Sequence, residues 1–414
     1  MMGAAVAVLA LIIGTAGDAA ADPLRAFDEA VDRVDRTLTV STPGGLVRAE
    51  LSGLADVEGY WIDQRAPGLI FAGDDSFANP RLSLFLDVLA GRYLYGFVQT
   101  RVDRGFDPHS SSGAEARADE YLVRVSPLAD TRLHLQVGKF ATLVGGWVPR
   151  HHSWENPFVT APLPYERVTT VSDTRAPANP AEFLARKRIA DNKREWVPML
   201  WGPSYTSGAA AFGHLGDFDY GAEVKNAALS SRPDVWDGSD RGWDAPTVSG
   251  RLGWRPSAAW ALGVSGSRGP YLRSRAEPTL PAGRHPRDYH QSMVGADASY
   301  AIRHLQLWAE FFASRFEVPR VGQADVAAWY LEARYKLTPT VFAAARWNQQ
   351  VFGDVPDGRG GEEPWDNDMW RLDAALTWRM ARHLQTKVQY AIGNERGPLE
   401  QGEQLVAMQL TVKF

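Results

Sequence analysis

The last nine residues of the chain alternate between two kinds of side chain. Apolar residues occupy every second position from Val406 to the final Phe414, and small or polar residues stand between them. Because successive side chains of a strand point to opposite faces, this segment predicts a strand that is apolar on one face and mostly polar on the other. An amphipathic edge strand of a soluble sheet would show the same alternation, so the rest of the chain must distinguish the possible all-β architectures.

The same period of two recurs from residue 46 onward. It is clearest in the segments 47–52, 81–88, 132–137, 305–313 and 370–379. Seven short turns alternate with longer stretches rich in Gly, Pro and Asp, at 62–79, 104–117, 140–205, 228–244, 268–288, 317–324, 351–366 and 394–402. Seven hairpins together with a first and a last strand make sixteen strands, and an even number leaves both ends of the sheet on one side.

This layout, closed by a terminal phenylalanine, resembles that of bacterial outer-membrane β-barrels. The resemblance implies a 16-stranded antiparallel transmembrane β-barrel over residues 46–414, with short periplasmic turns and long outer loops. It also implies that the barrel assembly machinery reads Phe414 as its signal. Trp370 and Trp378 lie eight residues apart on one face. This spacing suits the two aromatic girdles of such a barrel.

The N-terminal residues follow other patterns. Residues 1–21 contain an apolar core and a small-x-small motif, which predicts a signal peptide for export. Leu24, Phe27, Val31 and Val34 then recur at intervals of three and four, so residues 22–40 are predicted to form a short periplasmic helix.

Composition excludes several classes of protein. After the N-terminal segment no run of about 18 apolar residues occurs, which excludes a helical membrane protein. The net charge of −5 argues against a nucleic-acid partner, and the absence of cysteine excludes disulfides and thiolate metal sites. We expect no catalytic site, no cofactor and no metal. Ser265 lies mid-strand, and the adjacent His151 and His152 are expected to point apart.

The inward-facing positions carry charges of both signs. The candidate pore residues on the strands are Arg101, Arg124, Arg132, Arg346, Arg371, Glu120, Glu310, Glu332 and Asp373. Opposite charges on neighbouring strands attract each other, so many of these side chains should pair. A wide, water-filled pore with weak ion selectivity is expected, because sixteen strands leave an aqueous channel.

Residues 140–205 form the longest connection. A stretch of this length is expected to be ordered and functional. In porins the corresponding loop folds into the barrel and narrows it. Our hypothesis is a cationic constriction that attracts anions, with a short helix over 181–194 displaying the basic cluster. Its candidate residues are Arg150, Arg186, Lys187, Arg188, Lys193 and Arg194. The alternative is a solvated outer loop.

A shorter stretch resembles the phosphate-selective porin O/P family. It comprises Gly138-Lys139-Phe140, then Gly145, Gly146, Trp147 and Arg150, and then Asn156-Pro157-Phe158. That family is described as using stacked basic residues in its pore, and the mixed charges of this lumen depart from that pattern.

Together these features predict a general porin of the bacterial outer membrane that passes ions and small hydrophilic solutes by passive diffusion. Outer-membrane lipid and lipopolysaccharide, the barrel assembly machinery and further copies of the chain in a homo-oligomer, as a trimer, are the expected partners. Two alternatives stay open. One is an anion- or substrate-specific channel or a polysaccharide export channel, and the other is a barrel that sheathes a partner protein.

Overall fold

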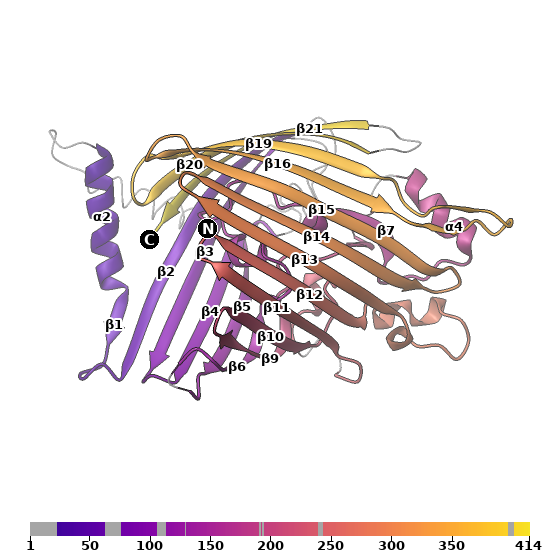
Figure 1. Cartoon of the computed structure of the whole chain (residues 1–414), viewed down its shortest axis with the longest axis horizontal. Coiled ribbons are helices and arrows are strands. Elements are labelled where there is room, and N and C mark those ends of the chain that lie inside the picture. The colour runs from indigo at the N-terminus through magenta and orange to yellow at the C-terminus, as the bar shows by residue number, and fades with distance from the viewer. Residues whose placement is uncertain are drawn as a thin grey trace.

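In the computed structural model, the chain is described over residues 23–62, 76–105, 113–128, 130–189, 192, 194–238, 243–395 and 401–414. Sixteen strands of this part close into an antiparallel β-barrel (Figure 1), which confirms the predicted fold class and strand number. The strands of the barrel are β2 (Val47–Ile62), β3 (Phe77–Ala90), β4 (Leu94–Asp103), β5 (Glu115–Val125), β6 (His134–Phe140), β9 (Thr206–Leu215), β10 (Phe218–Lys225), β11 (Thr247–Ser257), β12 (Trp260–Pro270), β13 (His290–Ile302), β14 (Leu305–Val318), β15 (Gly322–Lys336), β16 (Val341–Phe352), β19 (Met369–Arg379), β20 (Leu384–Glu395) and β21 (Gln401–Lys413).

Each barrel strand pairs with its neighbours in the chain, and β2 pairs with β21 to close the wall. Short connections gather at one end of the barrel, the turn end, and most of the longer ones gather at the other, the loop end (Figure 1). One predicted long connection, 317–324, is wrong, because β14 ends at Val318 and β15 begins at Gly322. Arg320 makes this tight turn possible by adopting a positive φ of 62°.

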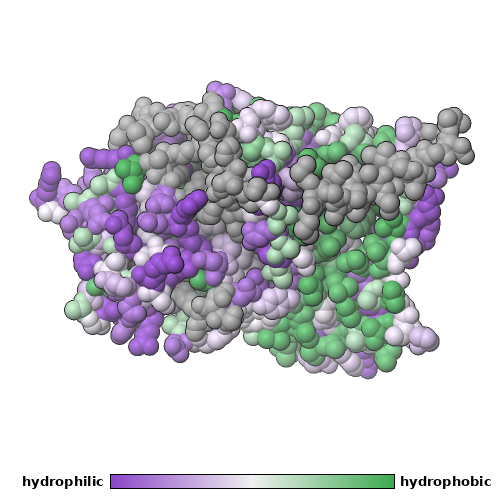
Figure 2. Space-filling model, turned by 180° about the vertical axis from the view of Figure 1, so that it is seen from behind, coloured by the Kyte–Doolittle hydropathy of each residue, from purple (hydrophilic) through white to green (hydrophobic). Residues whose placement is uncertain are grey.

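Apolar side chains cover the outside of the wall, and aromatic rings gather near both ends. Trp254 stacks with Phe218 near the turn end, and Trp347 stacks with Trp370 further along the wall, with ring centroids 5.3 Å apart. Figure 2 shows hydrophobic residues gathered in a patch on the wall, away from the hydrophilic loop end. None of the helices described is both long and apolar enough to cross a membrane.

Much of the described part of the connection between β6 and β9, residues 141–205, lies inside the barrel, and α4 lies at the loop end (Figure 1). It contains η1 (Val148–Arg150), α3 (Leu163–Glu166), β7 (Val168–Ser172), α4 (Pro180–Ala185), η2 (Arg186–Arg188) and β8 (Trp196–Pro198). Its buried residues Val144, Tyr165 and Leu200 share a hydrophobic core with Phe312 and Phe316 on the inner face of β14. This inner loop therefore fills the side of the lumen next to β13–β16.

The predicted N-terminal helix is present as α2 (Pro23–Thr37), and the three-residue strand β1 (Thr39–Ser41) follows it. Two further strands, β17 (Asp354–Pro356) and β18 (Glu362–Pro364), form a hairpin within the connection between β16 and β19. The predicted signal peptide, residues 1–21, lies outside the described residues.

Candidate functional site in the barrel lumen

Wall residues hold the inner loop by its backbone. The Glu310 carboxylate accepts hydrogen bonds from the backbone N–H groups of Gly146 and Trp147, and the Tyr165 hydroxyl donates to it over 2.6 Å. Gly145 has a positive φ of 89°, and a Cβ there would lie 2.1 Å from the Tyr165 hydroxyl oxygen. The loop can follow this path past Tyr165 because that position is glycine.

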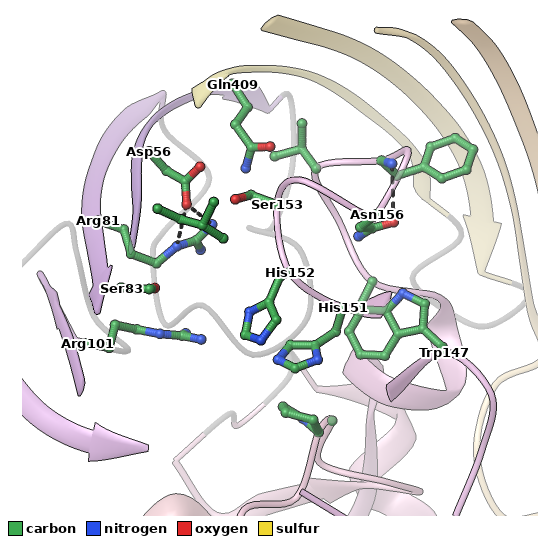
Figure 3. Close-up of a pocket in the computed structure, with 16 residues that line it drawn as sticks. Asp56, Arg81, Ser83, Arg101, Trp147, His151, His152, Ser153, Asn156 and Gln409 are labelled. Atoms are coloured by element: carbon green, nitrogen blue, oxygen red, sulfur yellow. Dashed lines mark hydrogen bonds and ion pairs between the residues drawn. The ribbon is translucent and has the colours of Figure 1, made fainter. Parts of the chain in front are cut away.

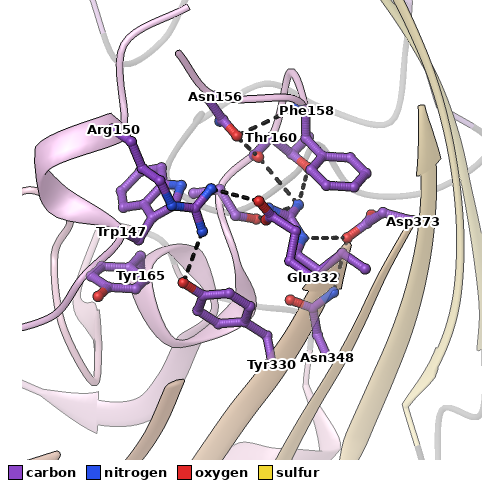
Figure 4. Close-up of polar contacts among 12 residues, drawn as sticks. Trp147, Arg150, Asn156, Phe158, Thr160, Tyr165, Tyr330, Glu332, Asn348 and Asp373 are labelled. Carbon is purple, nitrogen blue, oxygen red and sulfur yellow. Dashed lines mark hydrogen bonds and ion pairs between the residues drawn. The ribbon is translucent and has the colours of Figure 1, made fainter. Parts of the chain in front are cut away.

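A second set of contacts surrounds Arg346, which is fully buried. Its Nε donates to Asp373 over 2.9 Å, and its Nη2 donates to the loop carbonyl oxygens of Thr160 and Ala161 over 3.2 and 3.1 Å. Figure 4 shows the neighbouring Arg150, whose guanidinium reaches Glu332 over 2.5 Å and the Tyr330 hydroxyl over 3.1 Å.

Arg371 completes this arrangement. Its Nη2 donates to the carbonyl oxygen of Ala161 over 2.6 Å, its Nε lies 3.0 Å from Asp373, and its Nη1 pairs with Glu166 of the loop. The structure thus brings together six of the residues selected from the sequence, all at the contact between wall and loop: Arg150, Glu310, Glu332, Arg346, Arg371 and Asp373. In these positions they fix the loop.

On the opposite side of the lumen the inner loop leaves a small cavity beside the wall. A cavity of about 160 Å³, which we call the eyelet, lies between the β2–β4 wall and the inner loop. Arg81 and Arg101 extend from the wall toward His151 and His152 of the loop (Figure 3). A solute that passes on this side of the loop meets these four side chains.

Carboxylates partner both wall arginines. Arg81 lies 3.0 Å from Asp56 and 2.6 Å from Glu58, and Arg101 lies 2.8 Å from Asp119. Two guanidinium groups therefore face three carboxylates, and neither sign dominates the eyelet. Pairing of this kind weakens the field that a passing ion would feel.

The two histidines add no charge near neutral pH. Burial lowers the pKa of His151 to about 4, and burial followed by repulsion from His151 and Arg101 lowers the pKa of His152 well below its usual value. Their rings lie against each other with centroids 3.9 Å apart, so the expectation that they point apart is wrong. The tight turn after η1 brings the rings together. His151 Nε2 lies 2.6 Å from the Tyr205 hydroxyl and its Nδ1 lies 2.5 Å from the Val148 carbonyl oxygen, so protein groups occupy both nitrogens.

A wider cavity of about 1150 Å³, the mouth, opens at the loop end. Charged residues of both signs and the aromatic Trp201 and Trp236 line it. Asp119 lines the mouth and Arg101 lines the eyelet, so their ion pair lies at the boundary between the two cavities. A third cavity, of about 470 Å³, lies between the inner loop and β9–β15.

The basic cluster of the inner loop is distributed over different surroundings. Arg186 is buried and donates to the Thr170 carbonyl oxygen over 3.1 Å, and Lys187 contacts Pro364 and Glu363 beside the β17–β18 hairpin. Arg188 is exposed, and Arg194 lines the mouth. Lys193 lies outside the described residues. The predicted helix is shorter than expected, since its last turn ends at Arg188.

The remaining candidates occupy other parts of the wall. Arg124 donates to Gln136 over 2.8 Å, Glu120 accepts from the Ala141 N–H over 2.9 Å, and the exposed Arg132 pairs with Asp130 in a turn-end connection. The sequence-based selection missed the eyelet histidines and Arg81 as a group. The two-residue period places Arg81 on the inner face of its strand, but no sequence signal shows where the loop approaches the wall.

Solved structures share the fold of this chain at low sequence identity. No protein-family model matches the chain, and no curated protein matches it. The outer-membrane channel DcaP of Acinetobacter baumannii is 9% identical, with a TM-score of 0.57 over 91% of this chain and 99% of that one. An anion-selective porin from Comamonas acidovorans is 10% identical, with a TM-score of 0.57 over 89% and 100%. OmpF of Salmonella typhi, in complex with daunomycin, is 10% identical, with a TM-score of 0.56 over 91% and 100%. At these identities the likeness shows that the chain has the fold of outer-membrane porins and channels.

Proposed function

We propose that this protein is a non-enzymatic diffusion channel of the bacterial outer membrane, which passes ions and small hydrophilic solutes with weak charge preference. The observation that supports this most directly is the eyelet. It is a polar cavity inside a closed barrel, and the Arg101–Asp119 pair separates it from the charged mouth. Exposed polar and charged groups along a lumen allow hydrated solutes to exchange water for protein contacts.

The orientation follows from the outer surface. The apolar wall with its aromatic rings would lie in the lipid, the turn end would face the periplasm, and the loop end would face the outside and the lipopolysaccharide. Assembly machinery that reads Phe414, and a homo-oligomer, as a trimer, belong to the same proposal.

The weak charge preference is proposed from the balance in the eyelet. Arg81 and Arg101 face Asp56, Glu58 and Asp119, whereas a ring of one sign would select strongly against ions of that sign. Neutral His151 and His152 leave this balance unchanged near pH 7.

The inner loop argues against a barrel that sheathes a partner protein and against a polymer export channel. A barrel that sheathes a partner protein needs an empty lumen, but here a hydrophobic core made partly of loop residues occupies it. Export of a polymer needs a continuous wide bore, but here the inner loop divides the lumen into separate cavities of about 160, 470 and 1150 Å³.

The test is single-channel recording of the purified protein in a planar bilayer, with the reversal potential measured under a salt gradient. We expect discrete conductance steps and a reversal potential near zero. Arg101→Gln should shift the reversal potential toward cation preference, because it removes one positive charge from the eyelet. Arg132→Gln, at the exposed turn-end position, is the matched control and should leave the potential unchanged.

Three outcomes would contradict the proposal. They are silence from correctly folded protein, equal behaviour of the eyelet and control variants, and a strong anion preference of the unmodified channel. A block of the current by inorganic phosphate would instead support the phosphate preference suggested by the resemblance of residues 138–158 to the porin O/P family.

A further inference from the structure

The first and last strands of the barrel meet along an incomplete seam. β21 pairs with β2 from Ile62 to Leu54, and the final contacts are hydrogen bonds between the backbones of Gly53 and Phe414. On its other side β2 pairs with β3 as far as Val47. The edge of β2 from Val47 to Ser52 thus extends beyond the end of β21, and exposed strand edges invite pairing with other chains.

The segment before the barrel covers this edge. β1 pairs with β2 in the register Thr39↔Glu50 to Ser41↔Arg48, and the Leu51 N–H donates to the Leu38 carbonyl oxygen over 3.0 Å. β1 therefore occupies the position along β2 that β21 does not reach.

Helix α2 then covers the end of β21. Ala30 and Val31 are 7% and 0% exposed, and they pack with Phe27 against the Phe414 ring. The tip of that ring also lies against Gly53, where a Cβ would come within 2.4 Å of the ring's Cζ. The last aromatic ring of the chain is thus enclosed between a glycine of the first strand and the apolar face of the helix.

Polar contacts attach the same helix to the turn between β19 and β20. The Asp28 carboxylate accepts from the backbone N–H groups of Arg382 and His383 over 3.1 and 3.2 Å, and Asp32 pairs with the side chains of both. His383 Nδ1 in turn lies 2.8 Å from the Lys413 carbonyl oxygen. The helix is therefore linked to β20 and to the end of β21 as well as to β2.

We propose that residues 23–41 form a seam strap, which keeps the first and last strands of the finished barrel paired and buries the terminal Phe414. One continuous segment contacts β2 through β1, the end of β21 through the apolar face of α2, and the β19–β20 turn through Asp28 and Asp32. Because its two halves are joined, docking of one half holds the other at high effective concentration. Separation of β21 from β2 at this end would require both halves to detach.

The test is hydrogen–deuterium exchange, followed by mass spectrometry, of the full chain in detergent micelles. Val31→Asp disrupts the apolar contact, and the double variant Asp28→Asn with Asp32→Asn disrupts the polar contact. We expect exchange in peptides that cover 47–53 and 410–414 to accelerate about tenfold or more in both, while peptides of β13 and β14 keep their protection. The control is the double variant Arg25→Ala with Glu29→Ala, an exposed pair on the side of the helix away from Ala30 and Val31, which should not change exchange at the seam.

Wild-type protection of 47–53 and 410–414 in a variant whose residues 23–41 exchange freely would overturn the proposal. If Val31→Asp fails to fold, Val31→Ala replaces it, and exchange in the peptides that cover 47–53 and 410–414 is compared with the wild type in the same way. Single-channel conductance should stay unchanged in all of these variants, because no strap residue lines the eyelet. A failure of the strap is therefore distinguishable from a failure of the proposed channel function.

Discussion

At the scale of single residues, burial changes the chemistry of the side chains that line the lumen. His151 and His152 lie where water is scarce, beside two arginines, and both effects favour the neutral imidazole. Each histidine therefore binds its proton less tightly in the folded chain than in the unfolded chain, whose imidazole pKa is about 6.5.

This difference predicts a stability that depends on pH. Between about pH 6.5 and pH 4 the histidines of the unfolded chain bind protons, whereas those of the folded chain stay neutral. The free energy of unfolding should therefore fall as the pH falls through this window. His152→Phe removes one of these groups and keeps an aromatic ring against Phe85. We expect the variant to lose fewer degrees of melting temperature between pH 7 and pH 4 than the unmodified protein, measured by thermal unfolding in detergent. Parallel curves for the two proteins would show that His152 does not contribute.

The sequence predicts which residues point inward, since that information is carried by the strand period alone. It could not predict which inward residues would face solute and which would face the loop. Arg101 and Arg346 have the same phase and charge, yet one lines the eyelet and the other is fully buried under Thr160 and Ala161. Whether each of these arginines is exposed to the lumen depends on the path of the inner loop, which is distant in the sequence.

At the scale of elements, the inner loop and the strand wall form one packed unit. Arg346 contributes charged hydrogen bonds to Asp373 and to loop carbonyl groups, with no exposure to solvent. Removal of Arg346 takes one of two arginine partners from the buried Asp373 carboxylate, and it leaves the loop carbonyl oxygens of Thr160 and Ala161 without this donor.

We therefore expect Arg346→Met to destabilise the folded barrel by about 2–3 kcal/mol and to increase the noise of the open channel, because the loop loses one of its attachments. Arg315→Met is the matched control. Arg315 also pairs with an aspartate on a neighbouring strand, Asp325, but both side chains are half exposed. That change should cost about 1 kcal/mol or less. Equal losses in thermal or denaturant unfolding would contradict the proposed role of Arg346.

The elements themselves could be predicted to different degrees. Strands were predictable because each repeats a two-residue period between turns. The tight β14–β15 turn was not, because Pro319 and Arg320 also suit a longer loop. The end of the short helix at Arg188 was not predictable either, since a buried Arg186 and contacts of Lys187 with the β17–β18 hairpin determine it.

At the scale of the whole molecule, we propose that the eyelet limits what can pass through the channel. Its volume of about 160 Å³ compares with about 1150 Å³ for the mouth. The much larger mouth collects solutes but does not set this limit.

A steep size cutoff follows. In liposome swelling, we expect glycerol and pentoses to enter readily and trisaccharides to be excluded. Replacement of His152 by Gly, which removes a side chain from the eyelet, should raise the rate for hexoses more than the rate for glycerol. If trisaccharides enter as fast as pentoses, the solute path does not run through the eyelet.

The attachment of the inner loop also bears on how such a channel can evolve. Wall residues recognise the loop largely through main-chain groups: Glu310 accepts from the N–H groups of residues 146 and 147, Gln389 accepts from those of 159 and 160, and Lys387 donates to the Ser153 carbonyl oxygen. Every amino acid other than proline supplies the same backbone groups. Substitutions at His152 and other lining positions can therefore change which solutes pass during evolution, while the backbone conformation of the loop is kept.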